Sequence, residues 1–566
     1  MASPCRDITM AVADFPIFNY YDKQRFTQFS PQDCANWYLT QAPSGKKKNA
    51  LYPTMGRQHI DYLGNAVLVF DVQPRAIFKS IDFMYVVVGS TIFMVDQQFS
   101  EFPLVNTDFN KTAGTLSFSF LPVLSSEVYV MICDGTNVFV ITESTKSFQT
   151  VPMENVSGMT PGVPADLVNP TYVTAFSNRF VVAGADTTQF FLTQINLGPV
   201  SGGPPAVITI ENIFGNPYAT PPISYVFAQE SGVIRQFAVL KNNLYIFTDY
   251  TTGIWSNTPS SVFTGAGNVQ FPWKKNTSYD WDYGIADPLS LDTDFGMITW
   301  LAQNRNGLVQ FMSSNGQAPE KISTQAINTL LQQGVNMGQT LPFLTENANG
   351  FMYQYEDTIF YRVSAGETLN NDGTPESKSA SCIEFNFDTK TWHRCIELDG
   401  TRNLILDHIF FASKHIVTVI GQTMLYEMAG NIYINETSIP TTPVTFQANP
   451  MRYEMITPII SEEDYSEFKT YYVEIDFVWG QSLLPVNYVG TPEPDVELYW
   501  SDDGGISFSP ADNLEFSALG VYSWRMRWYQ MGVSRNRCYN LVAISGVPIV
   551  ILGAVHDITR VSGGAN

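Results

Sequence analysis

Three residues of the types that bind transition metals lie close together in the sequence, at Cys382, His393 and Cys395. Thiolate sulfur and imidazole nitrogen are ligands that Zn²⁺ prefers in proteins, so this group raises the question of a metal site. The three residues follow an apparent strand and turn, however, and lack the short paired spacing of zinc-binding motifs. With six irregularly spaced cysteines and five histidines in 566 residues, the sequence favours free, buried thiols and predicts no metal or cofactor.

The stretch 500–508, WSDDGGISF, has the spacing of the Asp box found in sialidase propellers. An Asp box is a hairpin device that ties down a turn through side-chain hydrogen bonds to the backbone, with a glycine at positive φ and an aromatic ring beneath. Glycosidase chemistry needs further groups, an arginine cluster and a Tyr/Glu nucleophile pair in sialidases, and nothing in the sequence identifies them. The stretch therefore predicts a structural turn without catalytic activity, formed by Ser501, Asp503, Gly505 and Phe508.

Near the C-terminus, residues 516–556 contain no Asp or Glu but several arginines. Because alternate residues of a strand point to one face, the arginines predict two short cationic stripes. Three roles remain open: a solvated strand edge with arginines against Trp524 and Trp528, an interface with an acidic neighbouring subunit or adaptor protein, and contact with DNA. The residues concerned are Arg525, Arg527, Arg535 and Arg537.

The composition predicts a folded, turn-rich protein. Apolar residues make up 45% of the chain and charged residues only 15%, with 39 glycines and 33 prolines. The net charge of −22 argues against a general affinity for phosphate backbones, which depends on Lys and Arg. Residues 1–18 lack the apolar run of a signal peptide, and the longest apolar run, 546–555, covers about half a membrane span. We therefore expect a protein made in the cytoplasm that inserts into no membrane.

Short β-strands must position these residues, because pairs of strand-like segments recur along the chain. Hairpins that recur every roughly 45 to 65 residues are typical of the four-stranded blades of a β-propeller. The expected fold is mainly β, with a six- or seven-bladed β-propeller-like domain. The pairs are 83–88 with 91–95, 128–132 with 138–141, 179–182 with 189–192, 243–247 with 253–255, 297–300 with 308–311, 358–362 with 382–386, and 415–419 with 424–426.

A chain of this length exceeds the size at which a single core keeps growing, so more than one domain is expected. Strand patterns continue past the propeller, at 471–478, 496–500 and 547–552, after a Pro/Thr-rich stretch at 439–444 that predicts a linker. They predict a C-terminal β-sandwich platform. The expected domains are an N-terminal arm or platform strands at 1–63, the propeller at 64–430 and the sandwich at 431–566.

Three segments interrupt the propeller pattern. Pro- and Gly-rich stretches predict inserted loops at 197–232 and 256–292, and long loops on a rigid scaffold often carry function. The segment 320–333 has the apolar spacing of an amphipathic helix, with Ser323 as its expected cap.

The C-terminal module resembles a known family. The Asp box is followed by 519–522 (LGVY), 525–528 (RMRW), 532–537 (GVSRNR) and a closing apolar strand. This order is similar to the C-terminal region of the tail hub, or nozzle, proteins of short-tailed (podovirus-type) bacteriophages, also called packaged-DNA stabilisation proteins. The chain departs from the family pattern at Met55 and in its longer loops. Further motifs in the family's order are 36–39, 51–56, 83–96, 245–248 with 253–255, 284–286 and 316–327.

The resemblance implies a structural subunit of the virion tail, assembled in the host cytoplasm and without enzymatic activity. Such proteins form a ring, usually a hexamer, below the portal and adaptor proteins. They extend the DNA channel, retain the packaged genome and dock tail fibres or spikes. Genomic double-stranded DNA would pass through the lumen without specific binding, which suits the acidic balance of the chain.

A carbohydrate-binding or depolymerising β-propeller is the alternative. The single Asp box and the 14% content of aromatic residues favour it. A propeller that serves as a general interaction scaffold is a third interpretation.

Overall fold

The structure is a computed structural model of the whole chain, and it describes most of residues 11–561. Within that span, the residues that it does not describe are 25, 42–47, 61–68, 112–113, 124–126, 153–166, 194–223, 227–231, 258–272, 277–279, 337–347, 365–381, 440–444, 463, 480–494, 511 and 516–522.

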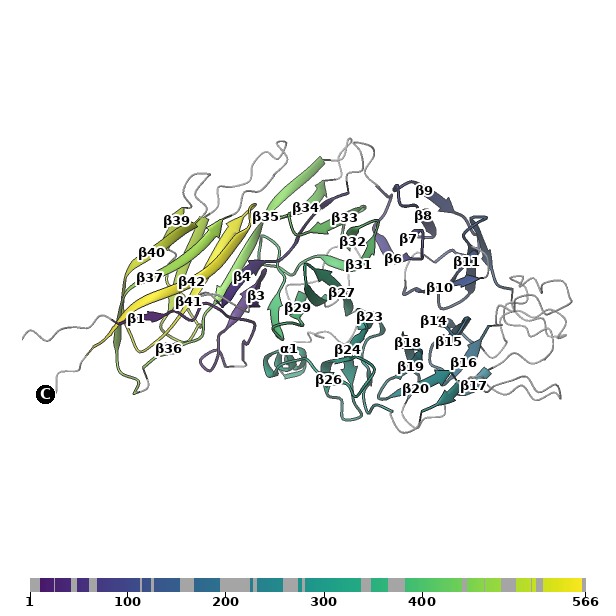
Figure 1. Cartoon of the computed structure of the whole chain (residues 1–566), viewed down its shortest axis with the longest axis horizontal. Helices are drawn as coiled ribbons and strands as arrows, with labels where there is room; N and C mark the ends of the chain where they lie inside the picture. The colour runs from purple at the N-terminus through teal and green to yellow at the C-terminus, as the bar shows by residue number, and fades with distance from the viewer. Residues whose placement is uncertain are drawn as a thin grey trace, which may run out of the picture.

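Seven antiparallel blades follow one another through the described residues, five of them as separate sheets of four or five strands and the last two within one 15-stranded sheet (Figure 1). The blades are arranged in a ring around a common centre (Figure 1). The first four blades are β6 (Pro74–Lys79), β7 (Met84–Val88), β8 (Thr91–Val95) and β9 (Glu101–Leu104); β10 (Ser117–Val123), β11 (Glu127–Cys133), β12 (Val138–Thr142) and β13 (Ser147–Thr150); β14 (Pro170–Phe176), β15 (Arg179–Gly184), β16 (Gln189–Leu192) and β17 (Ser224–Val226); and β18 (Ile234–Leu240), β19 (Asn243–Thr248), β20 (Thr252–Asn257) and β21 (Trp273–Lys275).

The last three blades carry the additions to this pattern. Blade five has an extra strand and a short 3₁₀ helix, blades six and seven are parts of one larger sheet, and blade seven takes its outermost strand from the N-terminal region. They consist of β22 (Gly284–Ile285), the 3₁₀ helix Pro288–Ser290, β23 (Asp292–Asp294), β24 (Met297–Gln303), β25 (Val309–Ser314) and β26 (Glu320–Lys321); β27 (Asn349–Tyr355), β28 (Thr358–Ser364), β29 (Cys382–Asn386) and β30 (Thr391–Arg394); and β31 (Ile405–Phe411), β32 (Lys414–Val419), β33 (Leu425–Ala429) and β5 (Gly56–His59).

The mainly β, propeller-like fold is therefore confirmed, and the blade number is seven. Each of the seven hairpins expected from the sequence is the middle pair of strands of one blade. The burial of these strands in the core explains why the sequence pattern identifies them. β7, for example, is buried along its whole length, so it reads as a continuous apolar run.

The apolar core of the propeller consists of seven clusters, one between each pair of neighbouring blades. The last of these joins blade one to blade seven, where Ile77 and Val86 pack in one cluster with Ile416 and Leu425. The backbone N–H of Ile77 also donates to the carboxylate of Asp407 across this junction, at 3.4 Å. The ring is thus closed by packing as well as by chain connection.

Strand β5 completes blade seven by pairing antiparallel with β33, with Gly56 opposite Ala429 and His59 opposite Tyr426. Its other edge meets β34 (Ile434–Ile439) in parallel. Gly56 has no room for a side chain, because a Cβ atom there would lie 2.4 Å from the carbonyl oxygen of Ile434. The close approach of three strands therefore explains the glycine.

The C-terminal module is a β-sandwich that lies beside the propeller (Figure 1). Its two sheets pack face to face over one core that includes Trp37, Tyr453, Val473, Trp528 and Leu541. One sheet contains β1 (Ala11–Asp14), β3 (Trp37–Gln41), β4 (Asn49–Pro53), β42 (Ile549–Arg560), β37 (Phe468–Trp479) and β40 (Ser523–Ser534), and the other contains β2 (Asp33–Ala35), β35 (Thr445–Ile456), β41 (Asn536–Ser545), β36 (Ile460–Ser461), β38 (Asp495–Ser501) and β39 (Asp512–Glu515).

The expected ranges 1–63 and 431–566 meet in this sandwich. The range 1–63 supplies β1 to β4 to its sheets and β5 to the propeller. Strand β35 pairs with β34 in its first half and with β41 in its second half, so one hydrogen-bonded sheet runs from the propeller into the sandwich. Residues 440–444 of the expected linker lie outside the described residues, and the strands on either side of them, β34 and β35, pair antiparallel with Ile439 opposite Thr445.

Two further expectations need correction. The range 256–292 is not one loop, because β21, β22 and the 3₁₀ helix lie within it; its residues 258–272 and most of the range 197–232 lie outside the described residues. The helix α1 (Gln325–Asn336) begins later than the expected 320, because Glu320 and Lys321 pair with β25. Its first turn is capped by Thr324, whose hydroxyl accepts the N–H of Ile327 at 3.3 Å. Ser323 instead donates to the side chain of Asn328.

Candidate functional site

The Asp box forms a turn at the end of β38. The hydroxyl of Ser501 donates to the Oδ1 atom of Asp503 at 2.6 Å and accepts the N–H of Gly505 at 2.9 Å. The same Oδ1 atom accepts the N–H groups of Ile506 and Ser507, both at 3.0 Å. Hydrogen bonds from Ser501 and Ser507 hold the pKa of Asp503 well below its usual range. An exposed carboxylate that accepts these hydrogen bonds stabilises the turn. Because its pKa is low, it is poorly suited to act as a general acid.

The two glycines of the box let the turn lie against the N-terminal region. Gly505 has a φ of +83°, and a Cβ atom there would lie 2.9 Å from the ring of Pro31. Gly504 also has a positive φ and approaches the backbone of Gln28. Phe508 is half-buried beyond the turn. The box therefore fixes the segment around residues 28–31 to the sandwich.

The four arginines of the predicted interface do not form one surface. Arg537 on β41 is 1% exposed, with two guanidinium nitrogens on Asp502 at 2.6 and 2.9 Å and a third bond to the carbonyl of Met531. A buried arginine that is fully bonded within its own chain is not offered to a partner, so its assignment to an interface was wrong. Asp502 is the second residue of the Asp box, and Arg537 therefore holds that turn to β41.

The remaining arginines lie on the solvent side of the sandwich. Arg525 is 69% exposed and lies 3.5 Å from Glu474, and Arg535 is 67% exposed and lies 3.4 Å from Glu467. Arg527, 43% exposed, donates to Glu474 at 2.8 Å. Each has an acidic partner in its own chain, and these partners come from β37 and the segment before it. Although residues 516–556 contain no acidic residue, Glu474 and Glu467 from earlier in the chain lie next to these arginines in the structure.

Aromatic rings accompany the arginines on this face. The guanidinium of Arg527 lies 4.5 Å from the ring centre of Tyr472 and 5.8 Å from that of Tyr529. Trp528, by contrast, points into the core of the sandwich, and Trp524 is partly exposed. Arginine packing on aromatics is thus present, but on tyrosines rather than on the tryptophans named from the sequence.

Strand β40 is an edge strand in the described part of the chain, with β37 on one side and no further strand on the other. It is twelve residues long, and its exposed side chains include Arg525, Tyr529 and Val533. A long edge strand presents unpaired backbone groups to which another chain can bind. The candidate functional site is this edge with the arginines beside it, referred to below as the β40 edge.

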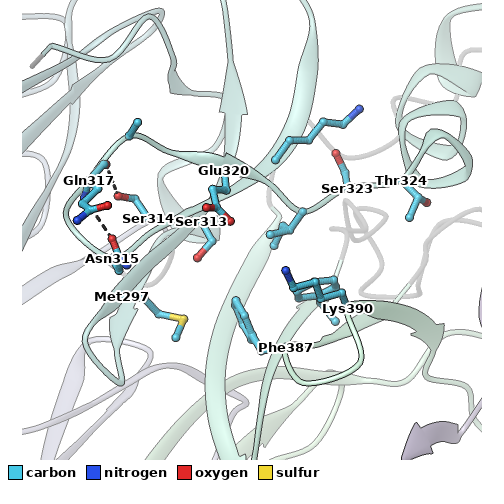
Figure 2. A pocket seen from close by; sticks show the side chains of 14 residues that line it. Met297, Ser313, Ser314, Asn315, Gln317, Glu320, Ser323, Thr324, Phe387 and Lys390 are labelled. Atoms are coloured by element: carbon cyan, nitrogen blue, oxygen red, sulfur yellow. Dashed lines mark hydrogen bonds between the residues drawn. The ribbon is translucent and has the colours of Figure 1, made fainter.

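A cavity of about 420 Å³ lies between blade five, the start of α1 and the turn of blade six (Figure 2). In Figure 2, Phe387 and Lys390 lie on one side of the cavity, and Glu320 and Ser313 lie on the other. Hydroxyl, amide and aromatic groups together suit a polar ring such as a sugar. Glu320 is the one carboxylate among the described lining residues, whereas glycoside hydrolysis commonly uses two. The described lining thus combines hydroxyl, amide and aromatic groups with a single carboxylate.

Cys382, His393 and Cys395, for which the sequence predicts no metal site, come together in blade six. Glu384, which was not singled out from the sequence, lies among them, with its Oε1 atom 2.9 Å from the Nε2 atom of His393. The alternation Cys-Ile-Glu at 382–384 and His-Arg-Cys at 393–395 is the signal that could have revealed it, because alternate strand residues share a face.

Comparisons with known proteins are limited. No family model matches the chain, and no curated protein matches it. Similar solved structures include KlHsv2 with loop 6CD replaced by a Gly-Ser linker, 8% identical over 64% of this chain and 97% of that chain, with a TM-score of 0.27. A chain of a nidogen/laminin complex is 9% identical over 57% and 95%, with a TM-score of 0.27. The WD40 domain of Neurospora crassa Pan2 is 7% identical over 71% and 90%, with a TM-score of 0.24.

Those similarities carry no argument about function, and the fold assignment rests on the sheet order and the seven cores between blades. In the described residues, no helix is long and apolar enough to cross a bilayer.

Proposed function

We propose that the chain is a structural subunit of the tail nozzle, or hub, of a short-tailed bacteriophage, without enzymatic activity. The observation that carries the proposal is the collinear set of motifs that resembles this family, from 36–39 near the N-terminus to the Asp box and 532–537 near the C-terminus. In this role, copies of the chain form a ring in the virion tail that extends the portal and adaptor channel and docks fibres or spikes.

The β40 edge supports assembly into a ring. A subunit in a closed ring contacts its two neighbours through two different surfaces, and an exposed strand edge is one surface suited to such a contact. The exposed Arg525 and Arg535 lie beside this edge, where rim charges contribute mainly steering and choice of partner. A chain with net charge −22 offers many acidic groups to which they can turn in a neighbouring copy.

The acidic charge of the chain also suits a channel for DNA. A basic wall would bind the duplex and release counterions, whereas an acidic or neutral wall lets the duplex slide. Retention of the genome then requires a physical gate; of the two stretches that the sequence suggests for it, 197–232 contains β17 of blade three, and 256–292 contains β21 and β22 of blades four and five. The purified protein is expected to show negligible affinity for duplex DNA even at about 50 mM salt, where backbone binders are strongest.

Electron microscopy of the purified chain tests the proposal directly. A hollow ring of subunits is the expected result, together with no shift of duplex DNA in a mobility assay. Discrete monomers or compact trimers at all concentrations, or tight salt-sensitive binding to DNA, would contradict it.

The cavity in Figure 2 favours a second function, the binding of carbohydrate. Saturation-transfer NMR with bacterial surface polysaccharide separates the two, with Phe387→Ala as the test variant and Phe295→Ala, an exposed ring on a different turn, as the control. Binding that Phe387→Ala alone removes would support the glycan function. Sustained release of reducing ends would contradict both a non-enzymatic nozzle and a binding-only cavity.

A further inference from the structure

Four side chains with metal-binding atoms share one face of blade six. Strands β29 and β30 are antiparallel, with Glu384 opposite His393. One step along, the N–H of Cys395 donates to the carbonyl of Cys382 at 2.9 Å. Because residues two apart on a strand point to the same side, Cys382 and Glu384 face the same way, as do His393 and Cys395. The sheet thus builds a two-by-two array of two thiols, a carboxylate and an imidazole.

The array is compact and buried. One ligand atom from each of Glu384, His393 and Cys395 lies within 4.8 Å of the others. Cys382, which lies opposite Cys395, is not one of these three, and its Sγ atom accepts a hydrogen bond from the hydroxyl of Ser364 at 3.4 Å. All four residues are at most 2% exposed. The Nδ1 atom of His393 is buried and has no hydrogen-bond partner among the described residues, so the internal bonding of the blade does not fully use this ring.

The surrounding groups set the charge of the array. Arg362 on β28 donates to the Oε2 atom of Glu384 at 2.6 Å, and the hydroxyl of Tyr353 donates to the same atom at 2.7 Å. The Oε2 atom of Glu384 therefore faces a guanidinium and a hydroxyl, while its Oε1 atom lies against the ring of His393.

We propose that blade six binds one Zn²⁺ ion through Cys382, Glu384, His393 and Cys395. Zn²⁺ is bound in proteins by Cys sulfur, His nitrogen and carboxylate oxygen, and structural zinc sites are almost always four-coordinate. Binding releases the two thiol protons to solvent. Two thiolates and the Glu384 carboxylate then balance the ion and Arg362, so the buried array stays electrically neutral, as burial of charge requires. The ion would tie β29 to β30 on the face that packs against blade seven.

The purified full-length chain tests the site. After refolding with equimolar Co²⁺ in place of Zn²⁺, the wild-type protein should show a thiolate-to-cobalt absorption band in the near ultraviolet and tetrahedral bands in the visible. Elemental analysis of protein refolded with Zn²⁺ and passed over a chelating resin should give about one zinc ion per chain, as in other single structural sites. A wild-type protein that takes up neither metal overturns the proposal, as does a Cys382–Cys395 disulfide found by mass spectrometry in protein kept under reducing conditions.

Substitutions localise the metal. Cys395→Ala and His393→Gln should each lower retained zinc at least tenfold and shift or remove the cobalt bands. Cys133→Ala is the matched control, because Cys133 is equally buried but lies on β11 in the core between blades two and three. If Cys395→Ala fails to fold, the wild-type cobalt spectrum still decides whether thiolates hold the metal. Cobalt bands that are the same in Cys395→Ala as in the wild type would overturn the assignment.

Discussion

The closure of the propeller by β5 can be tested at Gly56. In Gly56→Ala the new Cβ atom would lie 2.4 and 2.7 Å from the carbonyl oxygens of Ile434 and Ile432, whereas ordinary contact begins near 3.4 Å. Strand β34 must then move away by about 1 Å, which is the difference between these distances. This movement strains or breaks the hydrogen bond from Gly56 N–H to the Ile432 carbonyl, now 2.8 Å long.

The cost follows from these two changes. A lost backbone hydrogen bond costs about 1 kcal/mol net, and overpacking costs a further 1–3 kcal/mol or so. The free energy of local unfolding where β5 pairs with β33 should fall by about 2–4 kcal/mol. This corresponds to amide exchange roughly 30- to 1000-fold faster in these two strands. Hydrogen exchange followed by mass spectrometry of peptides that contain Gly56–His59 and Leu425–Ala429 measures this change.

Gly553→Ala is the matched control. Gly553 also lies in a strand, on β42, but a Cβ atom added there would meet no heavy atom within 4 Å, and its φ is not positive. Its substitution should change exchange in the closure less than about threefold, because it neither strains the backbone nor meets a neighbour. Unchanged exchange in β5 and β33 of Gly56→Ala would refute the reasoning that the tight three-strand contact closes the ring.

Three further predictions concern other parts of the molecule. Burial raises the pKa of Asp292 from 3.8 to about 6, against the lowering effect of two backbone hydrogen bonds. Since the folded state then binds the proton more tightly than the unfolded state, this residue stabilises the fold at low pH by up to about 3 kcal/mol, and that stability is lost as the pH rises from about 4 to about 6. Asp292→Asn should therefore flatten the pH dependence of the melting temperature across this window, and an unchanged profile would contradict the assignment. Replacement of Arg525 and Arg535 by Gln should weaken ring assembly, most clearly at low salt, as measured by native mass spectrometry. Equal assembly of the variant and the wild type would show that these arginines only contact solvent. Gly505→Val should lower the thermal stability of the sandwich by about 1–3 kcal/mol through its positive φ, whereas Asp503→Asn should keep the fold and any binding activity; loss of a measurable glycosidase activity in Asp503→Asn would place the protein in a different class.

The sequence revealed the middle strands of every blade but not the strands at the inner and outer ends. The middle strands are buried on both faces, so β7 reads MYVVV without a polar residue. The outer strands are short and polar, and β26 consists of the two exposed residues Glu320 and Lys321. Strands of that kind exist because a neighbouring strand pairs with them, which no local pattern records. The same effect moved the expected start of the helix α1.

The candidate site shows a similar limit. Alternation placed Arg525 and Arg527 on one face of β40, as their shared contact with Glu474 shows. It could not show that Arg537 turns inward to Asp502, nor that Glu474 approaches from β37, because both contacts join segments far apart in the sequence. The array in blade six is an intermediate case. Its four members lie within 382–395, but their common face depends on the register between β29 and β30.

The N-terminal strands have consequences for how the protein is synthesised. Strand β1 pairs with β42, Ala11 with Ile558, and β5 pairs with β33, so these strands find their partners in segments that are synthesised much later. Contacts of this length slow folding, and the unpaired early strands are exposed to aggregation in the meantime. A translation product that stops short of β42 leaves β1, β4 and β37 without a shared partner. A chain that lacks β42 should therefore expose these strand edges and be less stable than a chain that contains it.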